Sequence, residues 1–126
     1  MLSETLRWRV NMANETNVAH GHTGATIYTH DFAGNFTSLN EEGERITGYS
    51  AKSVIGMNIR DIVVPDQLEM ARAMIARKAF EDTTVTEYDL DIIGRGGQVI
   101  PLRLETRIVY RDGRAFAVEG IANVRR

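Results

Sequence analysis

Residues 27–50 constrain the fold most strongly, because two extended segments flank a tight turn and lead directly into a helix signal. Polarity alternates over residues 27–31, Ala33-Gly34-Asn35 supplies turn-forming residues, and residues 35–39 are again extended in character. Alternation of this kind suits half-buried strands, and glycine and asparagine tolerate the backbone angles of tight turns. The segment therefore predicts a β-hairpin.

Helix-capping residues follow the hairpin. Asn40 is placed to accept a hydrogen bond from an early backbone N–H of a helix, and acidic residues at positions 41, 42 and 44 favour the positive end of that helix. Gly48 suits the left-handed position that closes a helix, and Ser50 is placed to cap a further short helix that ends near Gly56. We therefore expect two small helices after the hairpin.

Composition sets limits on what the chain can be. Its 126 residues, of which 43% are hydrophobic and 25% charged, suffice for one core of ordinary size. The net charge of -2 gives no reason to expect a nucleic-acid partner, and the lack of cysteine excludes a disulfide, a thiolate nucleophile and a cysteine metal site. The sequence has no long apolar run, and residues 1–10 are too polar for a signal peptide. We expect a cytoplasmic domain without membrane contact.

A longer helix is predicted from about residue 66 to residue 80. A proline precedes it, and Asp66 and Glu69 have the spacing of a capping box. Apolar residues then recur at helical spacing: Leu68, Ala71, Met74, Ile75 and Ala79. Met70 and Met74 are expected in the core; the alternative is that their adaptable thioethers line a pocket.

Three further strands complete the pattern. Residues 88, 90 and 92 are apolar or aromatic and alternate with acidic residues, and the mostly apolar even-numbered residues from 100 to 110 alternate with Arg103, Glu105 and Arg107. Turn sequences at 94–97 and 111–114 predict an antiparallel meander that ends in residues 116–124. The apolar face of the sheet must be buried against other elements of the fold. We therefore predict an α+β domain, with a five-stranded antiparallel sheet that carries its helices on one face.

Short motifs occur along the chain in a fixed order: Asp31-x-x-Gly34-x-Phe36-x-x-x-Asn40, Gly48-Tyr49-Ser50, Ile55-Gly56, Val64-Pro65-Asp66, Tyr88-x-Leu90-x-Ile92, Gly97-x-x-x-Pro101, Asp112-Gly113-Arg114 and Glu119-Gly120-Ile121-Ala122. From about residue 25 to residue 122, this ordered set resembles the PAS family of sensory domains. The resemblance implies that the chain consists of two parts. Residues 1–24 would form an N-terminal flanking helix and a connecting loop, and residues 25–126 would form the PAS domain.

The resemblance also implies a function. PAS domains serve as sensory modules of signalling proteins, and here we expect the input module of a bacterial sensor of the histidine kinase type, as in two-component systems. Such a module binds a small ligand in an apolar pocket, dimerises, or does both, and so regulates an attached or separate effector. The alternative is a ligand-free PAS module that only pairs proteins. The sequence has no recognised nucleophile–base or phosphate-loop signature, so we expect no catalysis.

Strand alternation and the resemblance together imply a set of inward-facing residues around a ligand pocket: Tyr28, His30, Ile59, Met70, Met74, Tyr88, Leu90, Ile92, Leu102, Leu104, Val118 and Ala122. Tyr28, His30 and Tyr88 would supply the few polar groups that orient a small ligand. For His30 there is a competing interpretation, a buried imidazole satisfied by a backbone carbonyl or a tyrosine hydroxyl.

No cofactor is predicted. Light-sensing flavin relatives carry a reactive cysteine at the position of Ile59 in Gly56-Met57-Asn58-Ile59-Arg60, so a flavin–cysteine adduct is excluded. Haem-bearing relatives use a histidine on the long helix, and residues 66–80 contain none. His20 and His22 lack a nearby third ligand, so no metal site is expected either.

The start of the chain predicts an association surface. Leu2, Leu6 and Val10 recur at intervals of four, which with Trp8 indicates an amphipathic helix. In PAS proteins such flanking helices lie against the sheet or pair with a second copy. We expect a homodimer whose interface includes Leu2, Leu6, Trp8 and Val10; the alternative is a helix that covers its own sheet edge.

Overall fold

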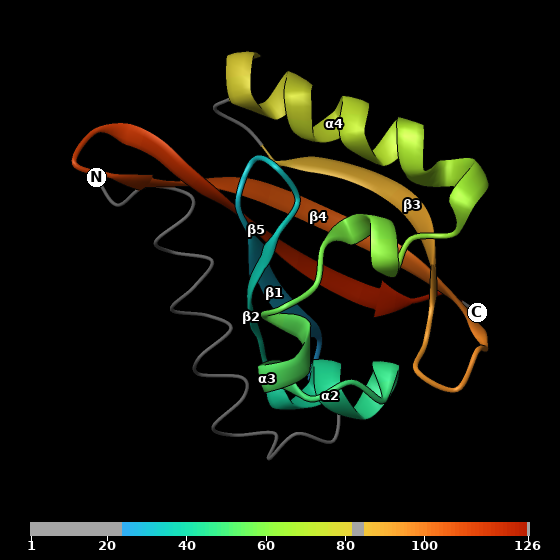
Figure 1. The fold of residues 1–126 in the computed structure, drawn as a ribbon. Coiled ribbons are helices and arrows are strands. Elements are labelled where there is room, and N and C mark those ends of the chain that lie inside the picture. Colours follow the sequence, from blue (N-terminus) through green and yellow to red (C-terminus); the bar gives the residue numbers. More distant parts are fainter. Residues whose placement is uncertain (1–23, 82–84, 126) are drawn as a thin grey trace.

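The computed structural model describes residues 24–81 and 85–125, which form a five-stranded antiparallel sheet with helices against one face (Figure 1). The order across the sheet is β2-β1-β5-β4-β3, so the last strand of the chain lies in the centre. The strands are β1 (Thr26–His30), β2 (Phe36–Leu39), β3 (Thr86–Ile93), β4 (Val99–Arg111) and β5 (Arg114–Val124). The predicted α+β class and sheet are confirmed.

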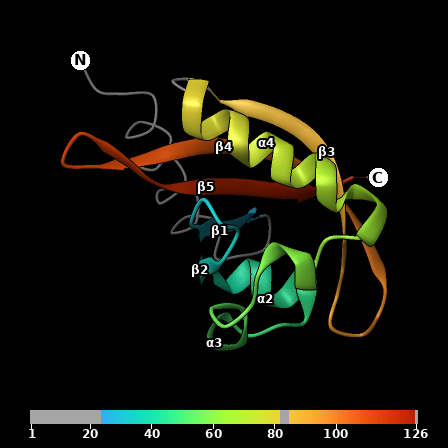
Figure 2. The ribbon, with the colours of Figure 1, turned by 45° about the horizontal axis from the view of Figure 1, so that its top comes forward.

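Two groups of helices cover the inner face of the sheet. The helices α2 (Glu41–Thr47) and α3 (Ala51–Val54) lie by β1 and β2, whereas α4 (Leu68–Glu81) runs along β3 and β4 (Figure 2). Two 3₁₀ turns, η1 (Ile59–Asp61) and η2 (Pro65–Gln67), connect the groups. In the part of the chain that the structure describes, no helix is long and apolar enough to span a membrane.

The predicted hairpin is confirmed, and Asp31 organises its turn. One carboxylate oxygen of Asp31 accepts hydrogen bonds from the backbone N–H groups of Ala33 and Asn35, each at 2.9 Å. Gly34 has a φ angle of 87°, a left-handed conformation that glycine adopts without steric cost. The β4–β5 turn uses the same conformation at Gly113, whose φ angle is 79°. Both turns therefore depend on glycine.

Asn40 joins this hairpin to α2. Its Oδ1 accepts a hydrogen bond from the N–H of Gly43 at 2.9 Å, which is the predicted cap, and another from the N–H of Ile27 on β1 at 3.0 Å. Its Nδ2 donates to the carbonyl of Ala25 at 3.0 Å. One side chain thus fixes the start of α2 relative to the sheet. The predicted closing and capping roles of Gly48 and Ser50 are also confirmed.

The predicted capping box at Asp66 and Glu69 is wrong. Asp66 lies inside η2, because Pro65 occupies the first turn of that segment and Val64 precedes it without a side-chain cap. The α-helix itself begins only at Leu68. A residue already within a turn cannot act as its N-cap, so the spacing of the two acidic residues was coincidental.

A capping box forms instead at the start of η1. The Oδ1 of Asn58 accepts a hydrogen bond from the N–H of Arg60 at 3.0 Å, and Asp61 accepts one from the N–H of Asn58 at 2.9 Å. The Nδ2 of Asn58 also donates to the carbonyl of Ala33 at 3.0 Å and to the Oδ1 of Asn35 at 2.9 Å. These bonds tie η1 to the β1–β2 turn.

The sheet register separates an inner row of side chains from an outer row. Leu104 faces inward and is only 2% exposed, opposite Ala122 of β5. Its neighbour Arg103 is exposed and forms ion pairs with Glu87 and Asp89, each at 3.1 Å. This is the alternation that the sequence predicts.

The outer row is not exposed along its whole length. Arg107 and Glu119 face each other across β4 and β5, and both are buried. Ala117 and Ile121 of β5 are buried as well. Polarity along β4 therefore does not by itself identify the side chains that face water.

The register yields a test. Leu104→Ala should lower the free energy of unfolding by about 2–5 kcal/mol, because it leaves a cavity in the core. Arg103→Ala should lower it by less than about 1 kcal/mol, because exposed ion pairs contribute little. Urea unfolding followed by circular dichroism measures both. A larger effect of the arginine change would mean that β4 is shifted by one residue.

Candidate functional site

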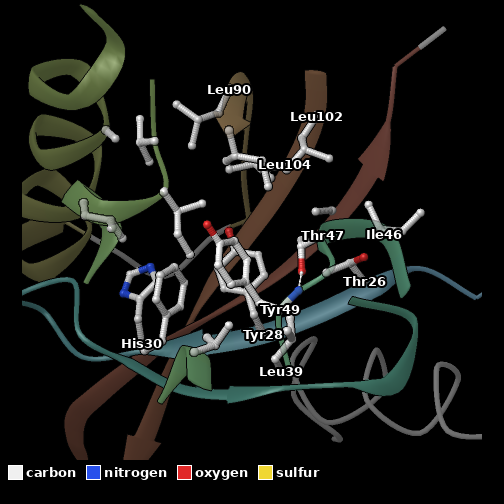
Figure 3. A pocket seen from close by; sticks show the side chains of 18 of the residues that line it. Thr26, Tyr28, His30, Leu39, Ile46, Thr47, Tyr49, Leu90, Leu102 and Leu104 are labelled. Atoms are coloured by element: carbon white, nitrogen blue, oxygen red, sulfur yellow. Dashed lines mark hydrogen bonds between the residues drawn. The ribbon is translucent and has the colours of Figure 1, made fainter. Parts of the chain in front are cut away.

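A cavity of about 70 Å³ lies between the inner face of the sheet and the helices. Figure 3 shows Tyr28 and His30 projecting into it from β1, with Leu90, Leu102 and Leu104 around the same space. Most residues of the predicted pocket line the cavity: Tyr28, His30, Ile59, Tyr88, Leu90, Ile92, Leu102, Leu104 and Ala122. The structure thus brings together residues from the two ends of the described chain.

The predicted pocket left out part of the cavity wall, on β1 and β2 as well as on the helices. The additional lining residues are Thr26, Phe36, Leu39, Ile46, Thr47, Tyr49, Val54, Ile62, Val63, Ala71 and Ile75. The signals for α2 and α3 located these helices but did not show which face turns inward. On α4, Ala71 and Ile75 belong to the predicted apolar stripe and share one face of the helix, but the predicted pocket did not include them.

Three predicted pocket residues do not line this cavity. Met70 is 38% exposed and Met74 is only half-buried, because the inward stripe of α4 runs through Ala71 and Ile75. Val118 faces the inner side of the sheet, where it is paired with His30 and Ile108. It is fully buried there and does not line the cavity. Placing these residues in the pocket was wrong.

Small residues lie at the centre of the sheet. Gly120 and Ala122 occupy inward positions of the middle strand, β5. Tyr28 is paired with Gly120, and its ring lies directly over that glycine: a Cβ added to Gly120 would be 2.2 Å from Cζ of Tyr28. The ring can therefore lie flat across the neighbouring strand only because position 120 has no side chain.

His30 occupies one end of an aromatic cluster. Its ring stacks on Tyr28 at a centroid distance of 5.9 Å and meets Phe36 edge-on at 6.1 Å. Its Nδ1 lies 2.7 Å from the carbonyl oxygen of Asp31, so Nδ1 carries the proton and Nε2 is left as the acceptor. This geometry supports the interpretation of an imidazole satisfied by a backbone carbonyl.

The imidazole of His30 is uncharged at neutral pH. Burial lowers its pKa below the ordinary value of 6.5, although the hydrogen bond to the Asp31 carbonyl and the charge of Asp31 oppose that effect. Among the residues that the structure describes, no Lys, Arg, Asp or Glu side chain lines the cavity. The cavity is therefore apolar and carries no fixed charge.

Burial also shifts the pKa values of two tyrosines in the cavity wall. Burial raises the pKa of Tyr88 to about 12. It also raises the pKa of Tyr28 well above 10, and the nearby Tyr88 acts in the same direction. Both phenols thus keep their protons at neutral pH, and each can donate a hydrogen bond.

The remaining sequence predictions concern metal binding and the dimer interface. Within residues 24–81 and 85–125, no group of three His, Cys, Asp or Glu side chains could hold a metal ion. The proposed dimer residues Leu2, Leu6, Trp8 and Val10 lie outside the described residues, as do His20 and His22.

Comparison with known proteins was made for the sequence and for the fold. A family model described as "PAS fold" matches residues 36–122, which is more than half of the chain. A search of curated protein sequences gives no significant match.

Solved structures of PAS domains are similar over most of the chain. The PAS domain of an HTR-like protein from Haloarcula marismortui has a TM-score of 0.70 at 15% identity, covering 94% of this chain and 99% of that one. A domain of the sensory box sensor histidine kinase/response regulator from Geobacter sulfurreducens has a TM-score of 0.66 at 18% identity, with coverages of 88% and 92%. The PAS domain of the RpfR quorum-sensing receptor from Cronobacter turicensis, in complex with C12:0, has a TM-score of 0.67 at 20% identity, with coverages of 79% and 92%. At these identities the similarity concerns the fold alone.

The contact between Tyr28 and Gly120 can be tested by a double-mutant cycle. Gly120→Ala should lower the free energy of unfolding by about 1–3 kcal/mol, because the new methyl group overlaps the tyrosine ring. In a Tyr28→Val background the same change should cost almost nothing, because the ring is gone. Gly56→Ala is the control, since a Cβ there would lie 3.6 Å from its nearest neighbour, an ordinary contact. Equal costs in the two backgrounds would show that the ring does not lie over position 120.

Proposed function

The chain belongs to the PAS family, and we propose that it is a sensory module that binds a small ligand in the cavity between β5 and α4. One observation carries this proposal: the core of a 126-residue protein leaves a cavity of about 70 Å³ instead of closing over it. Protein interiors are normally packed without voids larger than a water molecule. A space of this size is therefore a feature that needs an occupant.

The composition of the cavity wall also supports ligand binding. Aliphatic and aromatic side chains surround a few polar groups, among them Tyr28, His30 and Tyr88. Small-molecule sites typically have this composition, in which apolar walls give affinity and a few polar groups give orientation. The RpfR PAS domain, whose fold is similar, is described in complex with C12:0. That relative supports the use of this fold to bind a small molecule.

We propose that the ligand is neither a flavin nor a haem. Ile59, which stands at the position of the reactive cysteine of flavin relatives, lies in the cavity wall. The sequence of α4 contains no histidine to ligate a haem iron. A cavity of about 70 Å³ is also small for either group. The purified protein should therefore be colourless in the visible range.

A route for the signal lies at the edge of the cavity. Gln67, just before α4, exchanges two hydrogen bonds with Asp91 of β3: the backbone N–H of Asp91 donates to Oε1 at 2.7 Å, and Nε2 donates to the carboxylate at 3.1 Å. Arg125, at the end of β5, pairs with the same carboxylate. A ligand that displaces α4 would thus change the surroundings of Arg125. We propose that the response leaves the domain here, toward an attached or separate effector.

The proposed module would act as one of a pair. Leu2, Leu6, Trp8 and Val10 are the proposed contact with a second copy, as expected from their spacing. The type of parent protein, a bacterial histidine kinase or another sensor, is part of the same proposal. It is supported by the likeness to the sensor histidine kinase domain from Geobacter sulfurreducens.

Ligand binding can be tested with 1-hexanol as the probe and two matched variants of α4. In the parent protein 1-hexanol should produce saturable shifts of amide NMR signals in β1 and β5. Ala71→Leu should weaken this binding at least tenfold, because Ala71 is buried in the cavity wall and the larger side chain takes up the space. Ala76→Leu makes the same change at an exposed position of α4 and should leave binding unchanged.

Two further measurements complete this test. Thermal melts verify that both variants are folded, and native mass spectrometry under gentle and denaturing conditions shows whether the purified protein already carries a small molecule. Binding that is unaffected by Ala71→Leu would place the probe elsewhere. A parent protein that binds neither 1-hexanol nor any copurified molecule would favour the ligand-free pairing module.

A further inference from the structure

The polar groups of the cavity wall fall into two kinds. Thr47 is satisfied by the protein, because its Oγ1 donates to the carbonyl of Gly43 at 2.8 Å and accepts from the N–H of Tyr49 at 3.2 Å. By contrast, the hydroxyl groups of the three tyrosines in the wall, Tyr28, Tyr49 and Tyr88, have no hydrogen-bond partner within residues 24–81 and 85–125. Buried hydroxyls are normally paired, since an unpaired one costs free energy. Tyr28 and Tyr88 lie close enough for Tyr88 to raise the pKa of Tyr28, so their hydroxyls can act as a pair of donors to a molecule in the cavity.

The electrostatics of the wall disfavour an anion beside these hydroxyls. Burial makes the phenolate forms of Tyr28 and Tyr88 unfavourable, which is why both pKa values are raised. The same loss of hydration would act on a bound carboxylate. No Lys or Arg of the described part of the chain lines the wall to compensate for it, and His30 is neutral at pH 7. A charged head group would thus be buried without a counter-charge.

The volume limits the size of the occupant. A cavity needs about 10–15 Å³ to hold one water molecule, so a cavity of about 70 Å³ can hold more than one. An organic ligand that fills the same space must be small. Almost all of these atoms would contact apolar side chains.

Resting on the proposed function, we infer that the ligand is a compact, uncharged amphipathic molecule. It has a short apolar body, because the cavity of about 70 Å³ is small. It carries one neutral oxygen, of a hydroxyl, ester or ketone group, which accepts hydrogen bonds from the hydroxyls of Tyr28 and Tyr88. A carboxylate of the same length is rejected.

The test compares head groups on one chain length. The full chain is titrated at pH 7.5 with hexane, 1-hexanol, methyl pentanoate and hexanoate, and the dissociation constants are measured by NMR or calorimetry. 1-Hexanol and methyl pentanoate should bind at least tenfold more tightly than hexanoate. Tyr28→Phe and Tyr88→Phe should each weaken 1-hexanol binding by about three- to tenfold, the usual effect of one neutral hydrogen bond. Neither change should affect hexane.

Controls separate this inference from the proposed function. Tyr110→Phe removes the hydroxyl of a tyrosine that is 52% exposed and outside the cavity wall, and it should change no affinity. Hexanoate binding as tight as that of 1-hexanol, or equal affinities of the parent and both phenylalanine variants for 1-hexanol, would overturn the inference while leaving a ligand-binding cavity in place. Failure of every probe to bind would overturn both.

Discussion

The lack of side-chain volume at the centre of the sheet is the constraint on which the rest of this structure depends. The chain places its last strand in the middle, and that strand carries Gly120 and Ala122 on its inner face. The ring of Tyr28 can therefore lie across the glycine, and side chains of β3, β4 and α4 line the cavity beside it.

Buried polar side chains differ in how far they are hydrogen-bonded within the protein. Where a buried polar side chain has a structural role, nearly all of its hydrogen-bonding capacity is used within the protein. Asn40 joins β1 to α2 through three hydrogen bonds, and Asn58 joins η1 to the β1–β2 turn in a similar way. Where polar groups face the cavity, the phenol hydroxyls of Tyr28, Tyr49 and Tyr88 have no hydrogen-bond partner among the described residues. This contrast between the asparagines and the tyrosines supports the proposed ligand site.

Much of this could be predicted from the sequence, and the failures have specific causes. The hairpin, the cap at Asn40 and the inward row of β3 and β4 depend on local rules that the fold does not override. On α4 the predicted apolar stripe included Ala71 and Ile75, but the predicted pocket took Met70 and Met74, which are also apolar and one helical turn apart. Only packing against the sheet decides between two stripes separated by about 100°. The buried Arg107 and Glu119 on the outer row likewise depend on tertiary surroundings that alternation does not encode.

We interpret the space over β5 as a binding site and not as a packing defect. Nuclear Overhauser contacts between bound 1-hexanol and protein protons distinguish the two, because they depend on distances of a few ångströms. We expect contacts from the methyl end of the alcohol to Leu102, Leu104 and Ala122, and from its hydroxyl end to the rings of Tyr28 and Tyr88. Contacts confined to exposed side chains such as Ile55, Val99 or Phe116 would contradict it.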